Sequence, residues 1–425
     1  MSDSTRNPHA GVLPKLGLAT LIGPGLMVAA TGVGSGDLAG ATFAGANYGL
    51  VLIWAVLAGA FFKFVLTEGI ARWQLATDST VMEGWGDYLP GWVKAYFGTY
   101  MVLWTVAVSA ALANACGLGI SNLTGGAIST AWGAVLHSVI GCAFVWVGGF
   151  ASFEKVMKFL IGLMVVTLVL CAALTFQDVG GAVRGALIPT VPPGSTASLL
   201  ALIGGVGGTI TILSYNYWMR EEKISGPAFL KFVRADLAVA YTVTAVLAVA
   251  VMLLAHRAFF VTGVELNSAT AVTQMAESLG STLGPWGSFA YSIGFWGAVF
   301  SSLLGVWQSV PYLFADFYGI LKKYPKKVRD DLTQVTSTPY RMALLFITLV
   351  PIPLAFLGRP WVLLVIYTVV GSFFVPFLAA TLLYLNNRVS WASPIRRNGW
   401  GANAIMATTL LFFLYLGVRD VLNAF

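Results

Sequence analysis

The sequence predicts an all-helical integral membrane protein with eleven transmembrane helices, arranged as two five-helix halves and one extra helix. Three observations support this prediction. Of the 425 residues, 58% are hydrophobic and only 10% are charged, whereas soluble proteins carry roughly 25% charged residues. Apolar runs of about 20 residues, the length that spans a bilayer, recur along the whole chain. Lysine and arginine are also concentrated in alternate loops, as expected of segments that cross a membrane.

The apolar runs define the expected helices, all within one transmembrane domain, residues 1–425. The first half, 12–176, contains expected helices at Leu16–Ala46, Leu50–Trp73, Val93–Ile120, Ala131–Phe150 and Val156–Phe176. The second half, 196–388, contains expected helices at Ser198–Met219, Phe229–Ala255, Gly287–Tyr318, Arg341–Phe356 and Trp361–Leu385. The extra helix, Ala402–Leu422, occupies residues 401–422.

The distribution of positive charge predicts the orientation. With the N-terminus inside, the outer segments hold only Arg184, Arg257, Arg359 and Arg419, and nearly all other basic residues fall in inner segments. Lys63 falls inside an expected helix and is assigned to neither side. Because cytoplasmic loops retain Lys and Arg, we expect a cytoplasmic N-terminus and an external C-terminus in the plasma membrane, most simply a bacterial inner membrane. The net charge of +7 then reflects topology, and no nucleic-acid partner is expected.

Glycine interrupts two of the expected helices. The first contains Thr31–Asp37 and the sixth contains Gly204–Thr209, each with several glycines. Glycine destabilises a helix interior, and irregular backbone survives inside a membrane only where it is buried in protein or lines a cavity. Matching interruptions in two halves predict an inverted repeat with a central binding site. The alternative is that these glycines only let helices pack closely.

Asp37 is the most informative single residue. A carboxylate in the middle of a span is costly and is therefore a functional candidate. It is also a candidate N-cap for the second half of the first helix, and the two roles are compatible. The three histidines, His9, His137 and His256, lie away from the interruptions, and the sequence offers no nucleophile–base pair or phosphate loop at a suitable spacing. We therefore expect neither an enzyme nor a cofactor.

A family resemblance follows from the first two expected helices. It rests on Gly23-Pro24-Gly25, the interruption after it, Ala44–Gly49 and Leu52-Ile53-Trp54, which resemble the Nramp family of metal transporters. The resemblance extends with lower specificity through the sixth helix and Ser301-Ser302 in the eighth. It implies secondary-active transport and an inverted-repeat fold like that of the bacterial leucine transporter.

The family's metal ligands are largely replaced at the matching positions. The Asp-Pro-Gly-Asn motif of the first helix reads Gly34-Ser35-Gly36-Asp37 here, so the first ligand is lost and the second has become a carboxylate. In the sixth helix, the Ala-x-x-Met stretch corresponds to Gly208–Thr211, and threonine cannot replace the soft thioether that suits transition metals. The sequence therefore resembles a non-standard branch that lacks the usual transition-metal ligands.

Groups that carry protons in the family are also replaced. The Pro-His pair after the ligand stretch corresponds to Ile212-Leu213, and a second family histidine corresponds to Trp218. The acidic residues of the family's third helix have no counterpart between Val93 and Ile120. If transport is proton-coupled, Asp37 is the expected coupling residue.

Two substrate classes fit this altered site. The first is a small organic anion, because Gly34-Ser35-Gly36 resembles the Gly-Ser-Gly break with which related amino-acid carriers hold a carboxylate, and free amides at a helix N-terminus bind anions. Protonation of Asp37 would remove its repulsion. The expected substrate-binding residues are Gly34, Ser35, Gly36, Asp37, Gly207, Gly208, Thr209, Thr211, Tyr215 and Trp218, with the aromatic side chains and Trp307 forming a wall or simply packing.

The second class is a hard divalent cation, Mg²⁺ or Mn²⁺, with Asp37 as its metal ligand. Mg²⁺ needs only one or two carboxylates and keeps several waters. Ser35, Thr209, Thr211 and unwound carbonyls would complete the oxygen shell. A lone carboxylate, however, half-compensates a divalent charge, which favours the anion. Besides the solute and protons, membrane lipid is the only expected partner, and the chain is treated as a monomer by default.

Several other polar residues have weaker patterns. Glu68 and Arg72 are spaced for a local ion pair, and Arg220, Glu221 and Glu222 end the sixth helix as a candidate inner gate or a solvated helix end. Four further candidates for the cavity or for interhelical hydrogen bonds are Ser109, Asn114, Gln308 and Ser372.

Overall fold

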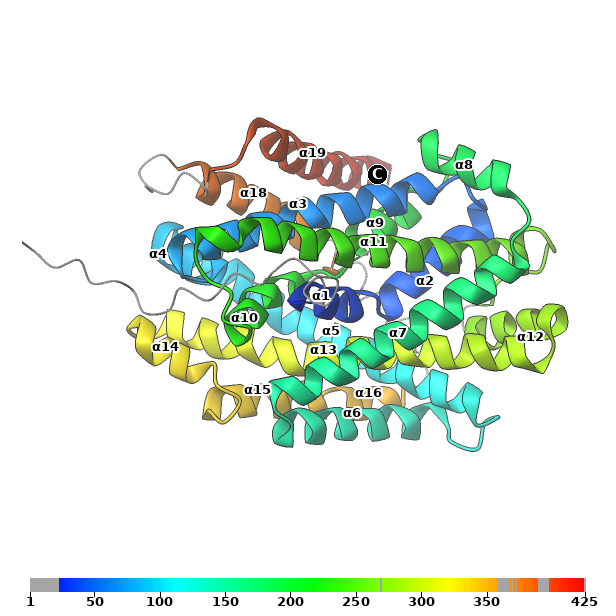
Figure 1. Cartoon of the computed structure of the whole chain (residues 1–425), viewed down its shortest axis with the longest axis horizontal. Coiled ribbons are helices and arrows are strands. Elements are labelled where there is room, and N and C mark those ends of the chain that lie inside the picture. Colours follow the sequence, from blue (N-terminus) through cyan, green and yellow to red (C-terminus); the bar gives the residue numbers. More distant parts are fainter. Residues whose placement is uncertain are drawn as a thin grey trace, which may run out of the picture.

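The computed structural model describes residues 23–205, 207–267, 270–357, 367, 370–371, 373–388 and 397–423. Within this part of the chain every regular element is helical, and the long helices run roughly along one axis (Figure 1). Eight segments in it are long and apolar enough to cross a membrane, and Phe374–Asn387 and Trp400–Tyr415 are shorter apolar helices. The chain is therefore a multi-spanning helical bundle.

The first half of the chain forms four of its five expected spans as long helices, the first expected span is described only from Gly23, and two short helices are added. Its elements are α1 (Pro24–Gly32), α2 (Ser35–Tyr48), α3 (Ile53–Thr77), α4 (Val81–Tyr88), α5 (Gly91–Leu123), α6 (Thr130–Val147), α7 (Phe150–Thr175) and α8 (Val179–Leu187). The short α4 has a capping box, in which the Thr80 side chain accepts from the Glu83 amide and the Glu83 side chain accepts from the Thr80 amide.

The second half contains more interruptions. Its elements are α9 (Thr196–Gly205), η2 (Ile210–Leu213), α10 (Ser214–Glu221), η3 (Pro227–Phe229), α11 (Leu230–Ala255), η4 (His256–Phe260), α12 (Ala271–Leu283), α13 (Pro285–Leu321), α14 (Lys326–Leu332), α15 (Thr338–Leu349), α16 (Pro351–Ala355), α18 (Phe374–Asn387) and α19 (Trp400–Asn423). The expected residues before Gly23, most of the span that starts at Trp361, and Ser372 lie outside the described residues.

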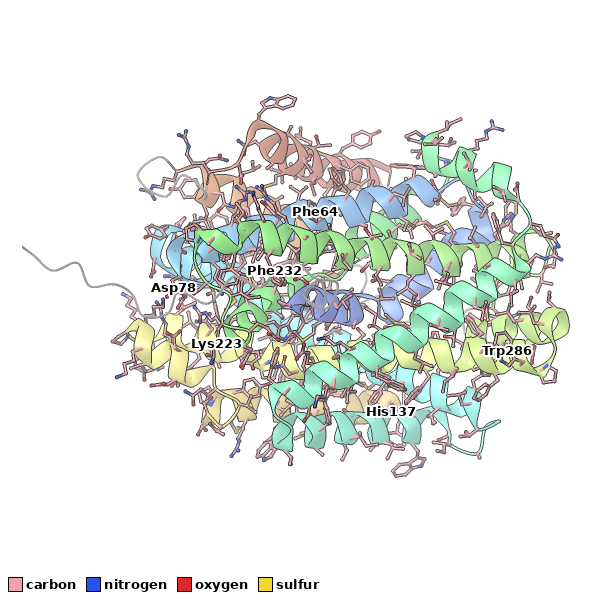
Figure 2. All side chains as sticks on the ribbon, in the orientation of Figure 1. Phe64, Asp78, His137, Lys223, Phe232 and Trp286 are labelled. Carbon is pink, nitrogen blue, oxygen red and sulfur yellow. The ribbon has the colours of Figure 1, made fainter. Side chains whose placement is uncertain are left out.

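The two ends of the bundle differ in composition. Helices α4 and α14 lie at one end and α8 and α12 at the other (Figure 1). Asp78 and Lys223 lie toward the first end, and Trp286 toward the second (Figure 2). We call these the α14 end and the α12 end. The basic segments that the sequence assigns to the inside include α14 itself.

Glycine allows several helices to approach closely in the core. A Cβ atom on Gly45 of α2 would lie 2.4 Å from the carbonyl oxygen of Met252 on α11, and one on Gly59 of α3 would lie 2.8 Å from that of Leu202 on α9. These separations are too short for any side chain, so the glycines set the distances between the helices. Close packing is thus one use of glycine in this chain.

The glycines of the two interruptions have a different role. Helix α1 ends at Gly32 and α2 begins at Ser35, while α9 ends at Gly205 and is followed by η2 and α10. Gly207 and Gly208 have φ values of +85° and +89°, which residues with a Cβ atom rarely adopt. A Cβ on Gly32 would lie 2.7 Å from the carbonyl carbon of Gly207. The two interruptions therefore lie in direct contact.

Candidate functional site

Asp37 connects the two interruptions. It lies in the first turn of α2, is 4% exposed, and its Oδ2 accepts a hydrogen bond of 3.2 Å from the Gly207 amide. Gly34, not Asp37, is the N-cap residue of α2, and no side chain caps this end of the helix. The carboxylate from the first interruption thus binds the backbone of the second.

Lys63 contributes an opposite charge that the sequence reasoning did not assign to the site. It lies in the middle of α3 and is completely buried. Its Nζ donates a hydrogen bond of 2.8 Å to the Gly204 carbonyl and another to the Gly208 carbonyl. The last carbonyls of a helix carry partial negative charge, so an ammonium group is well placed at the end of α9.

Asp37 and Lys63 form a buried pair of opposite charges. They bind the same stretch of backbone, one at the Gly207 N–H and the other at the Gly208 carbonyl, and they interact electrostatically. Either charge alone would be costly to bury, and the two together leave the site formally neutral. We call Asp37 and Lys63, bound to the backbone of Gly204, Gly207 and Gly208, the central pair.

The glycines of the first interruption make room for neighbouring side chains. A Cβ on Gly34 would lie 2.4 Å from Oγ of Ser302, and one on Gly36 would lie 2.6 Å from the Tyr367 ring. Ser302 donates a hydrogen bond of 2.7 Å to the Thr31 carbonyl, which lies in the last turn of α1. Tyr367 is therefore a neighbour of the site that the sequence did not indicate.

Three hydroxyl groups predicted for the site lie around these interruptions. Ser35 and Thr209 are buried; the Ser35 hydroxyl has no hydrogen-bond partner among the residues described, whereas the Thr209 hydroxyl lies within hydrogen-bonding reach of Tyr367. The Thr211 hydroxyl lies 2.6 Å from the position of a Cβ on Gly208. Because an unpaired buried hydroxyl is costly, the Ser35 hydroxyl is a group with unused hydrogen-bonding capacity near the central pair.

A small cavity lies beside Ser35. It has a volume of about 70 Å³, and its polar lining consists of Ser35, Thr42 and Asn114. Leu38, Tyr291 and Phe295 contribute apolar surface. Since a water molecule occupies about 30 Å³ in the liquid, the cavity has room for a few waters or a small organic group.

Two aromatic residues predicted for the site make their hydrogen bonds elsewhere. Tyr215 donates to Asp236 on α11 over 2.8 Å, and Trp218 donates to Gln308 on α13 over 2.7 Å. From Gln308 a chain of hydrogen bonds continues through Tyr312 to Glu221, toward the α14 end. The structure therefore does not bring Tyr215 and Trp218 to the central pair by these contacts.

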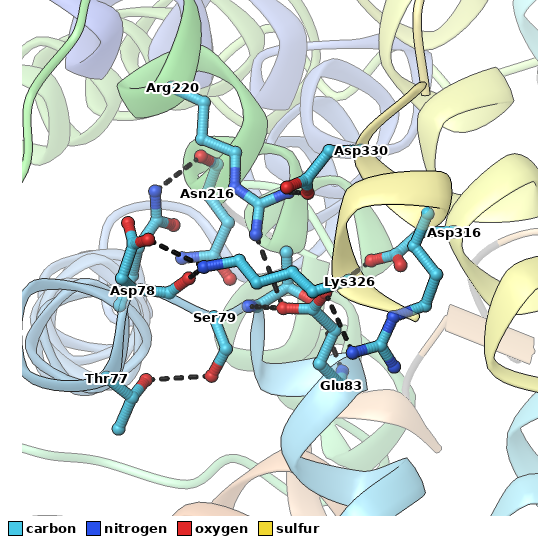
Figure 3. Close-up of polar contacts among 12 residues, drawn as sticks. Thr77, Asp78, Ser79, Glu83, Asn216, Arg220, Asp316, Lys326 and Asp330 are labelled. Atoms are coloured by element: carbon cyan, nitrogen blue, oxygen red, sulfur yellow. Dashed lines mark hydrogen bonds and ion pairs between the residues drawn. The ribbon is translucent and has the colours of Figure 1, made fainter. Parts of the chain in front are cut away.

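Charged side chains gather at the α14 end of the bundle (Figure 3). Arg220 pairs with Glu83 at 3.3 Å and with Asp330 at 3.0 Å. Arg329 pairs with Glu83 at 3.5 Å. Asp316 accepts hydrogen bonds from Thr80 and Tyr217. We call Glu83, Arg220, Asp316, Arg329 and Asp330 the α14-end cluster.

This cluster joins several elements at the α14 end. It joins α4, α10, α13 and α14, and the pair of Lys326 with Asp78 adds a further link. Burial and the nearby Asp316 raise the pKa of Glu83, although Arg220 and Arg329 oppose this effect. Arg220 therefore pairs with Glu83 and Asp330, and the inner gate that the sequence suggested for Arg220, Glu221 and Glu222 stays a prediction. The predicted local pair of Arg72 with Glu68 is also present, at 2.7 Å.

The described residues offer few metal ligands. Among them, no group of three or more His, Cys, Asp or Glu side chains is arranged to hold a metal ion. The oxygens nearest to forming a cation site are those of Asp37 and of the Gly204 and Gly208 carbonyls. Lys63 already binds both of these carbonyls.

Comparisons with solved structures establish the fold. A mutant of the Eremococcus coleocola manganese transporter matches with a TM-score of 0.71 and 13% identity, covering 94% of this chain and 86% of the other. The transporter MhsT in complex with L-phenylalanine matches with a TM-score of 0.63 and 17% identity, covering 96% of this chain and 99% of the other. The chain therefore has the helical fold shared by these leucine-transporter-like proteins.

The comparison with protein families covers almost the whole described chain. No curated protein matches. The family model described as natural resistance-associated macrophage protein-like, Nramp, matches residues 25–423. A match of this extent identifies a multi-pass membrane transporter and not an enzyme, and the chain belongs to the Nramp family.

Proposed function

We propose that this Nramp-family transporter carries a small organic carboxylate together with a proton. The observation that supports the proposal is the position of Lys63, whose ammonium group occupies the backbone carbonyls of the second interruption and faces Asp37. The place where a cation substrate would be attracted already contains a cation. An anion, in contrast, gains a buried positive partner.

Charge balance gives the reason for proton coupling. The central pair is neutral as it stands, and a carboxylate added to it would leave one net negative charge in a low-dielectric interior, which is costly. One proton on Asp37 restores neutrality and frees Lys63 to pair with the substrate. The proposal therefore predicts one proton carried with each carboxylate, with Asp37 as the coupling residue.

The first interruption supplies the remaining recognition groups. The backbone amides of Ser35 and Gly36 begin α2, and the N-terminus of a helix favours anions. The unpaired hydroxyl of Ser35 adds a donor. The cavity of about 70 Å³ beside Ser35 would hold the first atoms of the substrate's organic part.

The proposal places the site in an eleven-helix architecture. We propose two inverted five-helix repeats, 12–176 and 196–388, followed by an extra helix at 401–422, with the interruptions of the first and sixth spans at mid-membrane. The α14 end then faces the cytoplasm of a bacterial inner membrane, with the N-terminus inside and the C-terminus outside. The α14-end cluster would be the inner closure of a transporter that acts as a monomer.

A hard divalent cation, Mg²⁺ or Mn²⁺, is the second candidate. It is supported by the family and by the similarity in fold to a manganese transporter. Asp37 and the carbonyls of Gly204 and Gly208 are oxygen donors that suit such ions. This alternative requires Lys63 to leave the carbonyls or to lose its charge.

Thermal unfolding of the purified protein separates the two candidates. A ligand that binds only the folded state raises the unfolding temperature. At a ligand concentration one hundred times its Kd, it adds about 2.7 kcal/mol to the free energy of unfolding. We expect stabilisation by one class of small aliphatic or aromatic carboxylates, and stronger stabilisation at acidic pH. Stabilisation by Mg²⁺ or Mn²⁺, with no response to any carboxylate, would reject the proposal in favour of the cation.

A further inference from the structure

A second buried carboxylate, Asp236, lies at the other end of α1. It is in the second turn of α11 and is 1% exposed. Its Oδ2 accepts hydrogen bonds of 2.8 Å from the Gly25 amide in the first turn of α1 and of 2.8 Å from the Tyr215 hydroxyl of α10. Helix α1 is thus held at its start by Asp236 and ends at the interruption next to Asp37.

The fit between Asp236 and α1 is close. A Cβ on Gly25 would lie 2.8 Å from the Asp236 side chain, and one on Gly23 would lie 3.0 Å from its Oδ1 and 3.2 Å from Phe232. Phe232 lies on α11 near the start of α1 (Figure 2). The glycines therefore let the amides of α1 approach the carboxylate directly.

Asp236 has no compensating cation among the residues described. Its Oδ1 has no close hydrogen-bond partner there, although the backbone amide of Gly23 also stabilises the ionised carboxylate. The ionisable groups that face it are Tyr215 on α10 and Glu222 just after that helix, and Glu222 carries a like charge. A buried carboxylate that relies on neutral donors and a helix N-terminus is costly to keep ionised, and a bound proton removes that cost.

We infer that Asp236 is a second proton-binding site, which holds α1 in place when ionised and releases it when protonated. The ionised carboxylate makes a charge-assisted bond to the first turn of α1, and protonation weakens it. Because α1 is only nine residues long and is separated from α2 at Val33 and Gly34, it moves as a unit once that bond is weakened. The inference does not depend on which solute the protein carries.

Asp316 provides a matched control within the same bundle. It is also 1% exposed and also accepts from a tyrosine of α10, Tyr217. It differs because Arg220 and Arg329 lie near it. Substitution of Asp316 removes a carboxylate of similar burial without touching α1.

Hydrogen–deuterium exchange of the full-length protein in lipid nanodiscs tests the inference without any substrate. After correction for the intrinsic pH dependence of exchange, we expect the amides of 24–32 to exchange about tenfold faster at pH 5.5 than at pH 8 in the wild type. In Asp236→Asn, fast exchange should persist at both pH values. Asp316→Asn and Asp37→Asn should retain the wild-type response.

Two results would overturn the inference. The first is protection of 24–32 in the wild type that does not change between pH 8 and pH 5.5, which decides the matter even if Asp236→Asn does not fold. The second is an unchanged pH response in Asp236→Asn. A response that disappears instead in Asp37→Asn would assign the effect to the central pair.

Discussion

The central pair and the α14-end cluster are both buried charged groups, but their charges have different partners. In the α14-end cluster the side chains bind one another: Glu83 faces Arg220 and Arg329, and Arg220 also holds Asp330. In the central pair, Asp37 and Lys63 each bind main-chain groups of the second interruption. The first arrangement holds helices together through side chains, whereas the second holds a carboxylate and an ammonium on the backbone of an interrupted helix.

This difference separates a structural use of buried charge from a binding use. In the cluster each charged side chain faces others of opposite charge, and a ligand would have to break these ion pairs. Backbone amides and carbonyls in an interrupted helix can exchange partners without loss of the surrounding helices. The unpaired hydroxyl of Ser35 adds to this unused capacity. The comparison predicts large effects on binding at the central pair and small effects at the cluster.

The largest effect is expected for Lys63→Met. Loss of the ammonium group removes the positive partner for a carboxylate and leaves Asp37 uncompensated, which costs about 3–5 kcal/mol for a buried pair. Carboxylate-induced thermal stabilisation should be abolished, and the unfolding temperature should fall. Lys158→Met is the matched control, because that lysine is partly exposed and pairs with Glu154 one turn away.

The double variant Lys63→Met, Asp37→Asn sharpens this prediction. It should recover much of the lost stability, since no unpaired charge remains, without recovering carboxylate binding. The cation alternative would be supported instead if the wild type showed no response to carboxylates and the Lys63→Met variant gained affinity for Mn²⁺ or Mg²⁺.

An intermediate effect is expected for Gly207→Ala. Gly207 has φ of +85°, and a Cβ there would lie 2.7 Å from the Tyr241 ring. A residue in such a conformation costs on the order of 1–3 kcal/mol, so we expect a lower unfolding temperature and weaker ligand binding. Gly162→Ala, in α7 with no atom near the added methyl group, should be neutral or stabilising by up to about 1 kcal/mol. Equal behaviour of the two variants would contradict the assigned backbone geometry.

The smallest effect is expected for Glu83→Gln. Burial and Asp316 raise the pKa of Glu83, so the folded state binds a proton there more tightly than the unfolded chain does. Lowering the pH from neutral toward the ordinary range of a glutamate therefore favours the folded wild type through this group. Glu83→Gln should match or exceed the wild-type unfolding temperature by a few degrees at neutral pH, and this advantage should disappear in acid. Strong destabilisation at neutral pH would show that the ion pairs outweigh burial.

Most of the helical architecture could be predicted because the membrane imposes simple rules. Apolar length marks a span, and glycine clusters mark the interruptions, so α1–α2 and α9–α10 follow from the residues themselves. The position of Asp37 between the two interruptions also agrees with its charge within a span, and its role stays a prediction. A charged residue within a span is a functional candidate, and this rule also applies to Lys63. The sequence prediction assigned Lys63 to neither side of the membrane and gave it no role at the site.

Other parts of the site depend on contacts between distant segments. Tyr367 packs on Gly36 from far along the chain, and no local pattern indicates this contact. Tyr215 was expected at the substrate site because it follows the second interruption, yet its hydroxyl binds Asp236. Successive residues of α10 point toward different neighbouring helices, so spacing in the sequence alone could not determine which helix provides the partner of Tyr215.

Proton movement in proteoliposomes tests the central claim most directly. Vesicles containing a trapped pH indicator and the wild-type protein receive the small carboxylate that gives the largest thermal stabilisation. Vesicles with Asp37→Asn control for passive entry of the undissociated acid. We predict that the wild type acidifies the lumen faster than Asp37→Asn, with one proton per labelled carboxylate taken up. Equal acidification in both, or wild-type proton entry driven only by Mn²⁺ or Mg²⁺, would contradict the account.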